Sequence, residues 1–311
     1  MTEKRQLCIG TRGSALALWQ AEWVKSQLLA AHEELAVKLL VIKTTGDKIL
    51  DVPLARVGGK GLFVKEIEEA LLQGRADLAV HSVKDMPAEL PEGLHLAVMP
   101  PREDPRDALI SRNGLGLDKL PQGARLGTSS LRRAAQLLHL RPDLHIETLR
   151  GNVDTRLRKL ESEGLDAIVL AAAGLKRMEL SHVICEYLGP ERILPAVGQG
   201  ALGIETRTAD VFTNQMVASL AHQQTMTIVG AERAFLKRLE GGCQVPIGAH
   251  GTLEDETLIL AGMVADLQGA RLIRQELRAS ARQSEVTGER LAEAILEAGG
   301  AEILTEIYGR Q

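Results

Sequence analysis

The amino-acid sequence predicts an α/β protein with two similar α/β lobes and a smaller α+β domain at its C-terminal end. Three observations support this prediction. Short aliphatic runs alternate with helical patterns over the first two thirds of the chain, as in βαβ units. A strand that runs into a Gly-Thr turn occurs twice. From about His222 the pattern changes to neighbouring strands joined by short polar turns.

The first lobe is expected at residues 1–100, with residues 200–218 returning to it. Apolar periodicity predicts, in order, a strand at 7–11, a helix at 14–32, a strand at 36–43, a helix around Ile67 and a strand at 76–83. Residues 44–61 show no clear period. A loop of that length inside a compact domain is usually functional or mobile.

The second lobe is expected at residues 105–195, after a proline-rich junction. Its predicted elements are a strand ending at Thr128, a helix from Leu131, a strand at 146–149, a helix from Val153 and a strand at 166–172. Ile9-Gly10-Thr11 is repeated here as Leu126-Gly127-Thr128, although any strand-to-helix turn favours these residue types. We interpret the lobes as two copies of one plan with parallel strands.

The third domain is expected at residues 222–311. Ile228, Ala231, Phe235 and Leu239 predict one face of a helix that ends at the glycines following Glu240. Strands are predicted at 245–250, 257–265 and 270–278, and a last helix carries Leu291, Ile295 and Ala298. Strands that are adjacent in sequence and flanked by helices indicate an α+β domain.

The composition excludes several classes of protein. The chain of 311 residues has a net charge of −4 and only 2% aromatic residues, so no nucleic-acid partner is expected. The longest apolar run, 167–175, is far shorter than the roughly 20 residues of a membrane helix. Three cysteines form no disulfide framework, and the first ten residues lack the apolar core of a secretory signal. We therefore expect a soluble, cytoplasmic protein.

Several common cofactor motifs are not expected. Residues 198–203 match G-x-G-x-x-G, but the residues that follow look extended, whereas a dinucleotide site needs a helix there. Gly58-Gly59-Lys60-Gly61 lacks the hydroxyl residue of a phosphate-binding loop. The eight histidines show no metal-ligand spacing, so no metal site is predicted.

Positive side chains gather where the predicted strands of both lobes end. Open α/β sheets bind ligands beyond the carboxyl ends of strands, and helix N-termini, hydroxyl groups and arginine forks there bind anions. The residues are Arg12, Lys84, Arg132, Arg133, Arg150, Arg156 and Arg177. Each alone is compatible with a solvated surface arginine or lysine, but together they favour an anion-binding cleft.

Asp85 lies among these cations, in Val83-Lys84-Asp85-Met86. One interpretation is a structural ion pair with Lys84. The other is a carboxylate that faces the cleft, where it could stabilise a developing cation or exchange a proton with a leaving amine. The residues alone leave both interpretations open.

The three cysteines differ in their surroundings. Cys8 lies in an apolar strand and Cys185 in an expected apolar helix, so both are interpreted as buried hydrophobic residues. Cys243 follows two glycines in a tight loop, where a thiol can be accessible. No His–Asn signature of a cysteine protease accompanies it, and a loop cysteine without a role is equally compatible with the pattern.

Six motifs together resemble the porphobilinogen deaminase (hydroxymethylbilane synthase) family, over nearly the whole chain. They are Gly10-Thr11-Arg12-Gly13-Ser14-Ala15-Leu16-Ala17, Gly58-Gly59-Lys60-Gly61-Leu62-Phe63, His81-Ser82-Val83-Lys84-Asp85-Met86-Pro87, Gly127-Thr128-Ser129-Ser130-Leu131-Arg132-Arg133, Arg150-Gly151-Asn152-Val153-Asp154-Thr155-Arg156 and Gly241-Gly242-Cys243-Gln244-Val245-Pro246.

The resemblance implies two lobes like those of bilobal periplasmic-binding-protein folds, and a third domain that carries the cysteine. It implies a dipyrromethane cofactor, two linked pyrroles joined to Cys243 through a thioether, so that the thiol is an anchor. The implied reaction condenses four porphobilinogen molecules head to tail into hydroxymethylbilane and releases ammonia. We expect a monomer whose partner is this small molecule, with no membrane or nucleic-acid partner.

The resemblance also implies roles for individual residues. Asp85 would stabilise the positive ring nitrogen that forms when ammonia leaves, and would shuttle protons. The implied cofactor-binding residues are Cys243, Lys84, Asp85, Ser82, Thr128, Ser130, Arg132, Arg133 and Arg150. The implied substrate-binding residues are Arg12, Ser14, Arg150, Arg156, Arg177 and Phe63, with the loop 44–61 as a lid. The alternative is a bilobal protein that binds small anions without catalysis.

Overall fold

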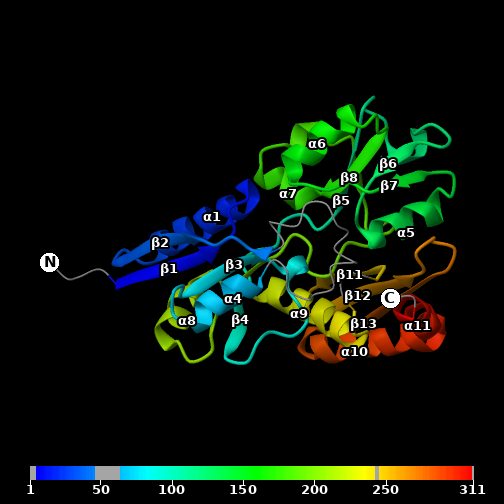
Figure 1. Ribbon diagram of the computed structural model, residues 1–311. Helices are drawn as coiled ribbons and strands as arrows, with labels where there is room; N and C mark the ends of the chain where they lie inside the picture. The colour runs from blue at the N-terminus through cyan, green and yellow to red at the C-terminus, as the bar shows by residue number, and fades with distance from the viewer. Residues whose placement is uncertain (1–4, 46–63, 242–244, 310–311) are drawn as a thin grey trace. The chain divides into compact units, whose positions relative to one another are not determined.

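The computed structural model describes residues 5–45, 64–241 and 245–309 (Figure 1). Contacts divide the chain into two compact units. The first contains Met1–Glu103 and Ala201–Met226, and the second contains Asp104–Gly200 and Thr227–Gln311. The three sheets described below confirm the predicted fold class, two α/β sheets and a smaller α+β part.

The first unit is built on a five-stranded sheet in the order β2-β1-β3-β10-β4. Its strands are β1 (Arg5–Thr11), β2 (Leu35–Val41), β3 (Leu78–Ser82), β4 (Leu94–Val98) and β10 (Leu202–Arg207). β1 is parallel to β2 and β3, whereas β10 is antiparallel to β3 and β4. The prediction of parallel strands was therefore wrong for β10, because this strand returns to the sheet from far along the chain.

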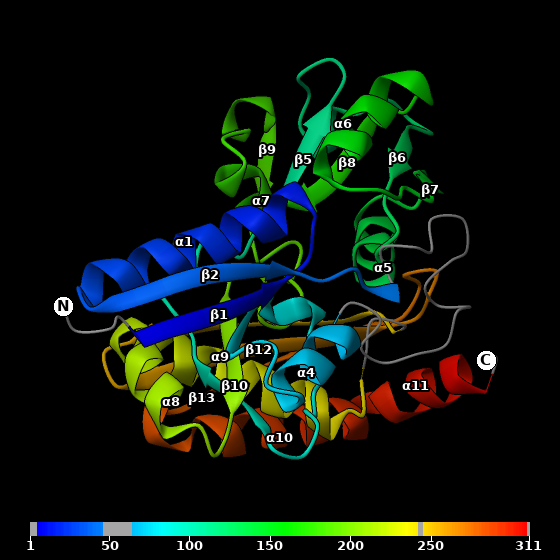
Figure 2. The ribbon, with the colours of Figure 1, turned by 60° about the vertical axis from the view of Figure 1, so that its left-hand side comes forward.

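Helices cover both faces of this sheet. Helix α1 (Ala15–Ala31) packs on one face together with α8 (Val211–Val217), and α4 (Lys65–Leu72) packs on the other, as Figure 2 shows for α1 and α4. Val24 and Leu28 of α1 belong to one apolar cluster, and Ile67 and Leu71 of α4 belong to another. Removal of these aliphatic side chains from water stabilises the packing of the helices on both faces of the sheet.

The second unit contains a sheet of the same plan, in the order β7-β6-β8-β5-β9. Its elements are β5 (Asp107–Ser111), β6 (Arg125–Gly127), α5 (Leu131–Leu140), β7 (His145–Glu147), α6 (Val153–Ser162), β8 (Ala167–Ala171), α7 (Ala172–Arg177) and β9 (Glu186–Leu188). β6 is parallel to β7 and β8, and β5 is antiparallel to β8 and β9. The shared strand plan confirms the interpretation of two related sheets, but the prediction of parallel strands was wrong for β5, as it was for β10.

The C-terminal part is an antiparallel sheet of β11 (Ile247–Glu254), β12 (Thr257–Ala265) and β13 (Leu272–Ser280), flanked by α9 (Gln223–Arg238), α10 (Ser284–Ile295) and α11 (Ala301–Tyr308). Phe235 of α9 and Leu291 of α10 are fully buried in its core. One final helix was predicted and two are present. The helix breaks at Gly299, whose φ of 107° is readily adopted only by glycine.

Two of the three cysteines, Cys8 and Cys185, lie within the described residues. Cys8 is buried in β1, as predicted, and burial raises the pKa of its thiol. Cys185 is not in a helix: it lies directly before β9 and is only half-buried. Its Sγ accepts a hydrogen bond from the backbone N–H of Ser111 at 3.3 Å. The helix prediction was wrong because the apolar residues around Cys185 lie beside β5 instead.

Within the described ranges, none of the helices combines the length and apolar character needed to cross a membrane. The same residues contain no group of three or more His, Cys, Asp or Glu side chains that could hold a metal ion.

Candidate functional site

The first unit has a pocket where the parallel strands β1 and β3 end. Arg12 follows β1 directly, and Ser14 caps helix α1, its Oγ accepting a hydrogen bond from the Ala17 N–H at 3.3 Å. Ser82 is the last residue of β3, and the chain then forms a single 3₁₀ turn that contains Asp85. Parallel strands end at one edge of a sheet, so the four polar side chains are brought together.

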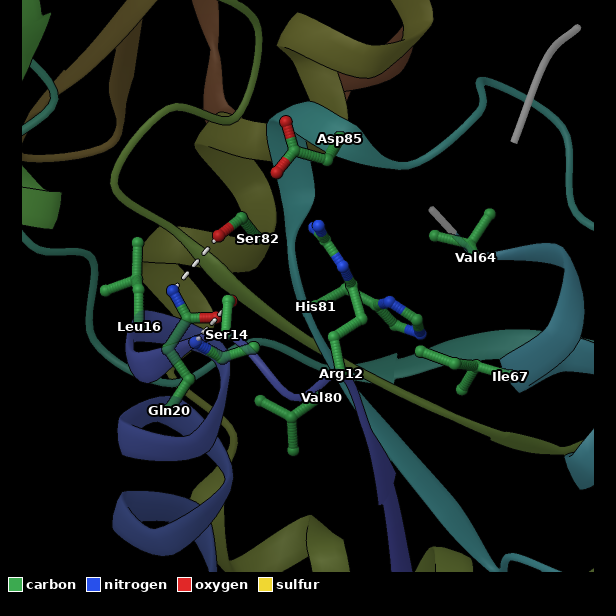
Figure 3. A pocket seen from close by; sticks show the side chains of 11 residues that line it. Arg12, Ser14, Leu16, Gln20, Val64, Ile67, Val80, His81, Ser82 and Asp85 are labelled. Atoms are coloured by element: carbon green, nitrogen blue, oxygen red, sulfur yellow. Dashed lines mark hydrogen bonds between the residues drawn. The ribbon is translucent and has the colours of Figure 1, made fainter. Parts of the chain in front are cut away.

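The pocket has an empty volume of about 450 Å³, including its opening to solvent. Figure 3 shows the side chain of Arg12 extending from the end of β1 in the direction of Asp85. The pocket is lined by Arg12, Ser14, Leu16, Ala17, Gln20, Val64, Ile67, Val80, His81, Ser82 and Asp85. Apolar walls with a few convergent polar groups are typical of small-molecule sites.

Two polar residues of the pocket were missed by the sequence analysis. Gln20 is buried on the inner face of α1, and its Nε2 donates to Ser82 Oγ at 3.0 Å. His81 precedes Ser82 and is also buried. One feature of the sequence could have revealed them: Gln20 and His81 are polar residues at positions where the apolar periodicity predicts a hydrophobic residue.

A buried ionisable cluster lies behind the pocket. His81 Nε2 is 2.9 Å from Glu205 Oε2, and these side chains are 5% and 0% exposed. Glu68 of α4 is buried nearby. Burial raises the pKa of Glu68 to about 7, repulsion by Glu205 adds to this rise, and His81 partly opposes it. Glu68 is therefore a carboxyl group whose ionisation the fold disfavours.

We expect Glu68→Gln to stabilise the protein at pH 8. The pKa of Glu68 is about 7 in the folded protein and 4.5, its ordinary value, in the unfolded chain. The unfolded chain therefore releases this proton first, and the wild type loses stability as the pH rises from 4.5 to about 7. An uncharged amide avoids that loss, which is worth about 1–3 kcal/mol. Urea unfolding at pH 8 and pH 4.5 checks this, and an equal effect at both pH values would contradict it.

The second unit presents backbone N–H groups at the ends of β6 and β7. Ser130 caps α5 through the Arg133 N–H, and Asn152 caps α6 through the Thr155 N–H at 2.9 Å. Ser129 Oγ donates to the Leu149 carbonyl at 2.6 Å, which joins the loops before the two helices. Two neighbouring helix N-termini favour the binding of negative groups.

Arg150 lies in the loop that precedes α6, and its Nε is buried without a hydrogen-bond partner among the described residues. Gly151 follows with a φ of 113°, and a Cβ there would lie 2.6 Å from Thr155, so this turn requires glycine. Arg156 Nε donates to the Gly151 carbonyl at 2.8 Å. The role of Arg150 in binding an anion stays a prediction, for which this unpartnered donor atom is available. Arg156 contributes to holding the loop.

The structure gives Arg132 and Arg133 a protein partner that was not predicted. Asp107, 0% exposed, accepts from Arg132 Nη1 at 2.7 Å and from Arg133 Nη2 at 2.7 Å. Burial opposes ionisation of Asp107, but the two guanidinium groups outweigh it and hold its pKa well below the usual range. These arginines are buried rather than solvated. Their role in binding a cofactor stays a prediction, and it would use the N–H groups that do not bind Asp107.

The other predicted residues have varied placements. Thr128 is buried, and its Oγ1 accepts from the Ser130 N–H at 3.2 Å. Arg177 is buried, and its Nη2 donates to the Gly200 carbonyl at 2.7 Å. Lys84 is half-buried in the turn before Asp85. Phe63, Cys243 and most of the loop 44–61 lie outside the described residues.

We expect Arg150→Leu to weaken the binding of an anionic ligand without loss of stability. One charged hydrogen bond contributes about 1.5–3 kcal/mol, which corresponds to a fall of about 10–150-fold in affinity. Because Arg150 Nε has no described protein partner, the unfolding midpoint should not fall. Arg158→Leu, an exposed position on α6, is the control. A parallel loss of affinity and unfolding midpoint would instead make Arg150 structural.

These features define an α/β ligand-binding protein whose strand ends carry donors for anionic groups and one exposed carboxylate. Comparison with known proteins identifies the family. Residues 7–215 match the model "Porphobilinogen deaminase, dipyromethane cofactor binding domain", and residues 226–297 match "Porphobilinogen deaminase, C-terminal domain". The chain belongs to the porphobilinogen deaminase family.

Curated relatives align over nearly the whole chain. Porphobilinogen deaminase of Syntrophotalea carbinolica is 60% identical and covers 97% of this chain and 96% of its own. The deaminase of Pelobacter propionicus is 56% identical, with 99% of both chains covered. Among solved structures, a YaeC-family lipoprotein of Enterococcus faecalis has a TM-score of 0.43 and 11% identity, covering 71% of this chain and 93% of its own, a likeness too weak to bear on function.

The donor set suits the dipyrromethane group that the matched domain binds. Each pyrrole of such a group carries carboxylates and one ring N–H. Carboxylates need donors, and the buried Nε atoms of Arg132 and Arg150 have no described partner. A ring N–H needs an acceptor, and the exposed carboxylate of Asp85 in the pocket of the first unit is of that chemical type. The described residues therefore fit the group in chemical type.

Proposed function

We propose that this chain catalyses the head-to-tail condensation of four porphobilinogen molecules into hydroxymethylbilane, with release of ammonia, as a step of tetrapyrrole biosynthesis. Family membership supports porphobilinogen deaminase activity and favours an enzyme over an anion-binding protein without catalysis. The observation that carries the mechanism is the pocket, in which Asp85 shares a small space with Arg12 and Ser14.

Asp85 is the proposed catalytic residue. Its carboxylate accepts a hydrogen bond from a pyrrole N–H and balances the positive charge that develops on that nitrogen when ammonia leaves. It also holds a proton at its Oδ atoms between steps. Apolar walls formed by Val64, Ile67 and Val80 lower the local dielectric, which strengthens this interaction.

Arg12 and Ser14 are proposed to bind the substrate carboxylates. Arg12 supplies a guanidinium fork, and Ser14 lies at the N-terminus of α1, where the helix dipole favours negative charge. Gln20 holds the Ser82 hydroxyl in place through its 3.0 Å hydrogen bond. Substrate position is thereby fixed relative to Asp85.

The remaining implied residues keep their proposed roles. Dipyrromethane, bound covalently at Cys243, supplies the primer that the reaction extends. Lys84, Ser82, Thr128, Ser130, Arg132, Arg133 and Arg150 are proposed to bind its carboxylates, and Arg156, Arg177 and Phe63 to bind the substrate. The helix N-termini at Ser130 and Asn152 support this assignment for the second unit.

Intact-mass spectrometry tests the covalent anchor. The purified protein should exceed its polypeptide mass by two linked pyrroles, and Cys243→Ser should show the bare polypeptide mass. Cys185→Ser, at a half-buried thiol, is the control and should keep the adduct. A bare mass for the wild type, or an adduct retained in Cys243→Ser, would contradict the proposal.

We also propose a monomer that acts in the cytoplasm. The monomer follows from the resemblance to the family, and the free thiols of Cys8 and Cys185 suit a reducing compartment. A solution mass close to 33.6 kDa would support the monomer, and twice that mass would contradict it.

A further inference from the structure

The buried cluster of His81, Glu205 and Glu68 lies in a layer that is otherwise aliphatic. β3 and β10 are antiparallel, with Gly203 opposite His81 and Glu205 opposite Ala79. Side chains two residues apart share a face of a sheet, so His81 and Glu205 lie on the same face as Ala79. Ala79 belongs to the apolar cluster that packs against α4, the helix that carries Glu68.

This cluster has more acceptors than donors. Glu205 Oε2 is paired with His81 Nε2 at 2.9 Å. Glu205 Oε1 and Glu68 Oε1 are buried with no hydrogen-bond partner among the described residues. A structural His–Glu pair needs only one carboxylate, and burial of a second one lowers stability. Such an arrangement behind a pocket is typical of a functional site.

Other charged groups near the layer have different partners. Glu66 of α4 accepts hydrogen bonds from Thr45. Arg207 of β10 donates to the carbonyls of Leu71 and Ala76 and pairs with Asp77.

Among the described residues, few charged groups are therefore left to act on the His81 ring. Glu205 of β10 and Glu68 of α4 lie behind it, and Arg12 and Asp85 line the pocket with it. His81 is the one member of the cluster that also lines the pocket.

We propose that His81 is a proton-transfer residue of the pocket, with Glu205 as its positioning residue. Glu205 fixes the ring through Nε2, and Nδ1 of His81 has no hydrogen bond to another described residue. A carboxylate bound to one ring nitrogen orients an imidazole and stabilises its charged form. The inference rests on the proposed function.

Asp85 must stay ionised while it balances the positive ring nitrogen, so the condensation needs a second group that holds one proton during that step. The C–N bond of the porphobilinogen aminomethyl group breaks with its electron pair on nitrogen, and a C–C bond forms to the receiving pyrrole carbon. That carbon then loses its proton, and the released ammonia ends as ammonium, so atoms and charge balance. Neutral His81 would take the carbon-bound proton as imidazolium and return it to ammonia.

The decisive variant is Glu205→Gln, because the substitution keeps the side-chain shape and its amide oxygen can still accept from His81 Nε2, while the negative charge is lost. Loss of that charge destabilises the imidazolium, so the acidic limb of the kcat profile should move to lower pH. Two measurements follow it: NMR titration of the His81 ring, assigned with His81→Gln, and the pH profile of kcat. Glu69→Gln, exposed on α4, is the control.

The expected result is a downward shift of both the NMR titration and the acidic limb of the kcat profile in Glu205→Gln, with neither changed in Glu69→Gln. His81→Gln should lower kcat at least about tenfold and remove that limb. An NMR shift with an unchanged kcat profile, or no shift in either, would overturn the proposal. A wild type without cofactor mass or activity would instead count against the proposed function.

Discussion

Replacing Asp85 with asparagine is expected to lower kcat by about 10²–10⁴-fold, with a change in the free energy of unfolding below about 0.5 kcal/mol. Asn keeps the shape but can neither hold a proton nor balance the positive charge on a pyrrole nitrogen. Asp85 is exposed at the pocket and has no described hydrogen-bond partner, so the fold loses nothing. Steady-state ammonia release and urea unfolding provide the two measurements.

Cofactor loading must be separated from chemistry in this experiment. The Asp85→Asn protein should carry the two-pyrrole adduct in its intact mass, since Cys243 is unchanged. Glu92→Gln, an exposed carboxylate in the same unit, should keep wild-type turnover. Near-normal turnover in Asp85→Asn would remove Asp85 from the mechanism, and loss of the adduct would assign it to cofactor assembly instead.

Local patterns in the sequence were sufficient for most elements of the fold. The helix predicted at 14–32 is α1 (Ala15–Ala31), and the strand predicted at 257–265 matches β12 residue for residue. Periodicity identifies α1 because this helix buries one face, and the continuous apolar run identifies β12 because this strand is buried on both faces. Sheet membership of β10 was not predictable in this way, because antiparallel pairing with β3 joins residues more than 100 positions apart.

The candidate site was predictable only in part, for a related reason. Arg12 and Asp85 could be found because they follow predicted strand ends, whereas Ser14 and Ser82 were implied by the resemblance to the family. The structure places all four in one pocket. The burial of Arg132 and Arg133 was not predictable, since it depends on Asp107, 25 and 26 positions earlier in the chain. Charge pattern locates arginines but does not identify their partners.

Asp107→Asn is expected to destabilise the protein by about 3–5 kcal/mol at pH 7, because it leaves two buried guanidinium groups without a counter-charge. Asp107 accepts hydrogen bonds from Arg132 Nη1, from Arg133 Nε and Nη2, and from Gln199 Nε2 at 2.9 Å. An amide at this position would also direct N–H donors at other donors. Urea unfolding at pH 7 measures the loss.

A half-buried pair of similar geometry provides the control. Arg141 donates to both carboxylate oxygens of Asp143 at 2.7 Å, but solvent reaches this pair and screens it, so Asp143→Asn should cost less. The pH dependence adds a second check. The pKa of Asp107 is depressed in the folded state, so its contribution is present above about pH 4 and is lost as pH falls.

The difference in unfolding free energy between wild type and Asp107→Asn should therefore narrow as the pH is lowered from 5 toward 2. A variant that unfolds at the wild-type urea concentration at pH 7 would contradict the assignment of Asp107 as the counter-ion of both arginines. A constant difference across the acid range would show that lost packing, rather than lost charge, causes the destabilisation. The predicted combination is a large loss at pH 7 that shrinks in acid, which only an ionised buried carboxylate produces.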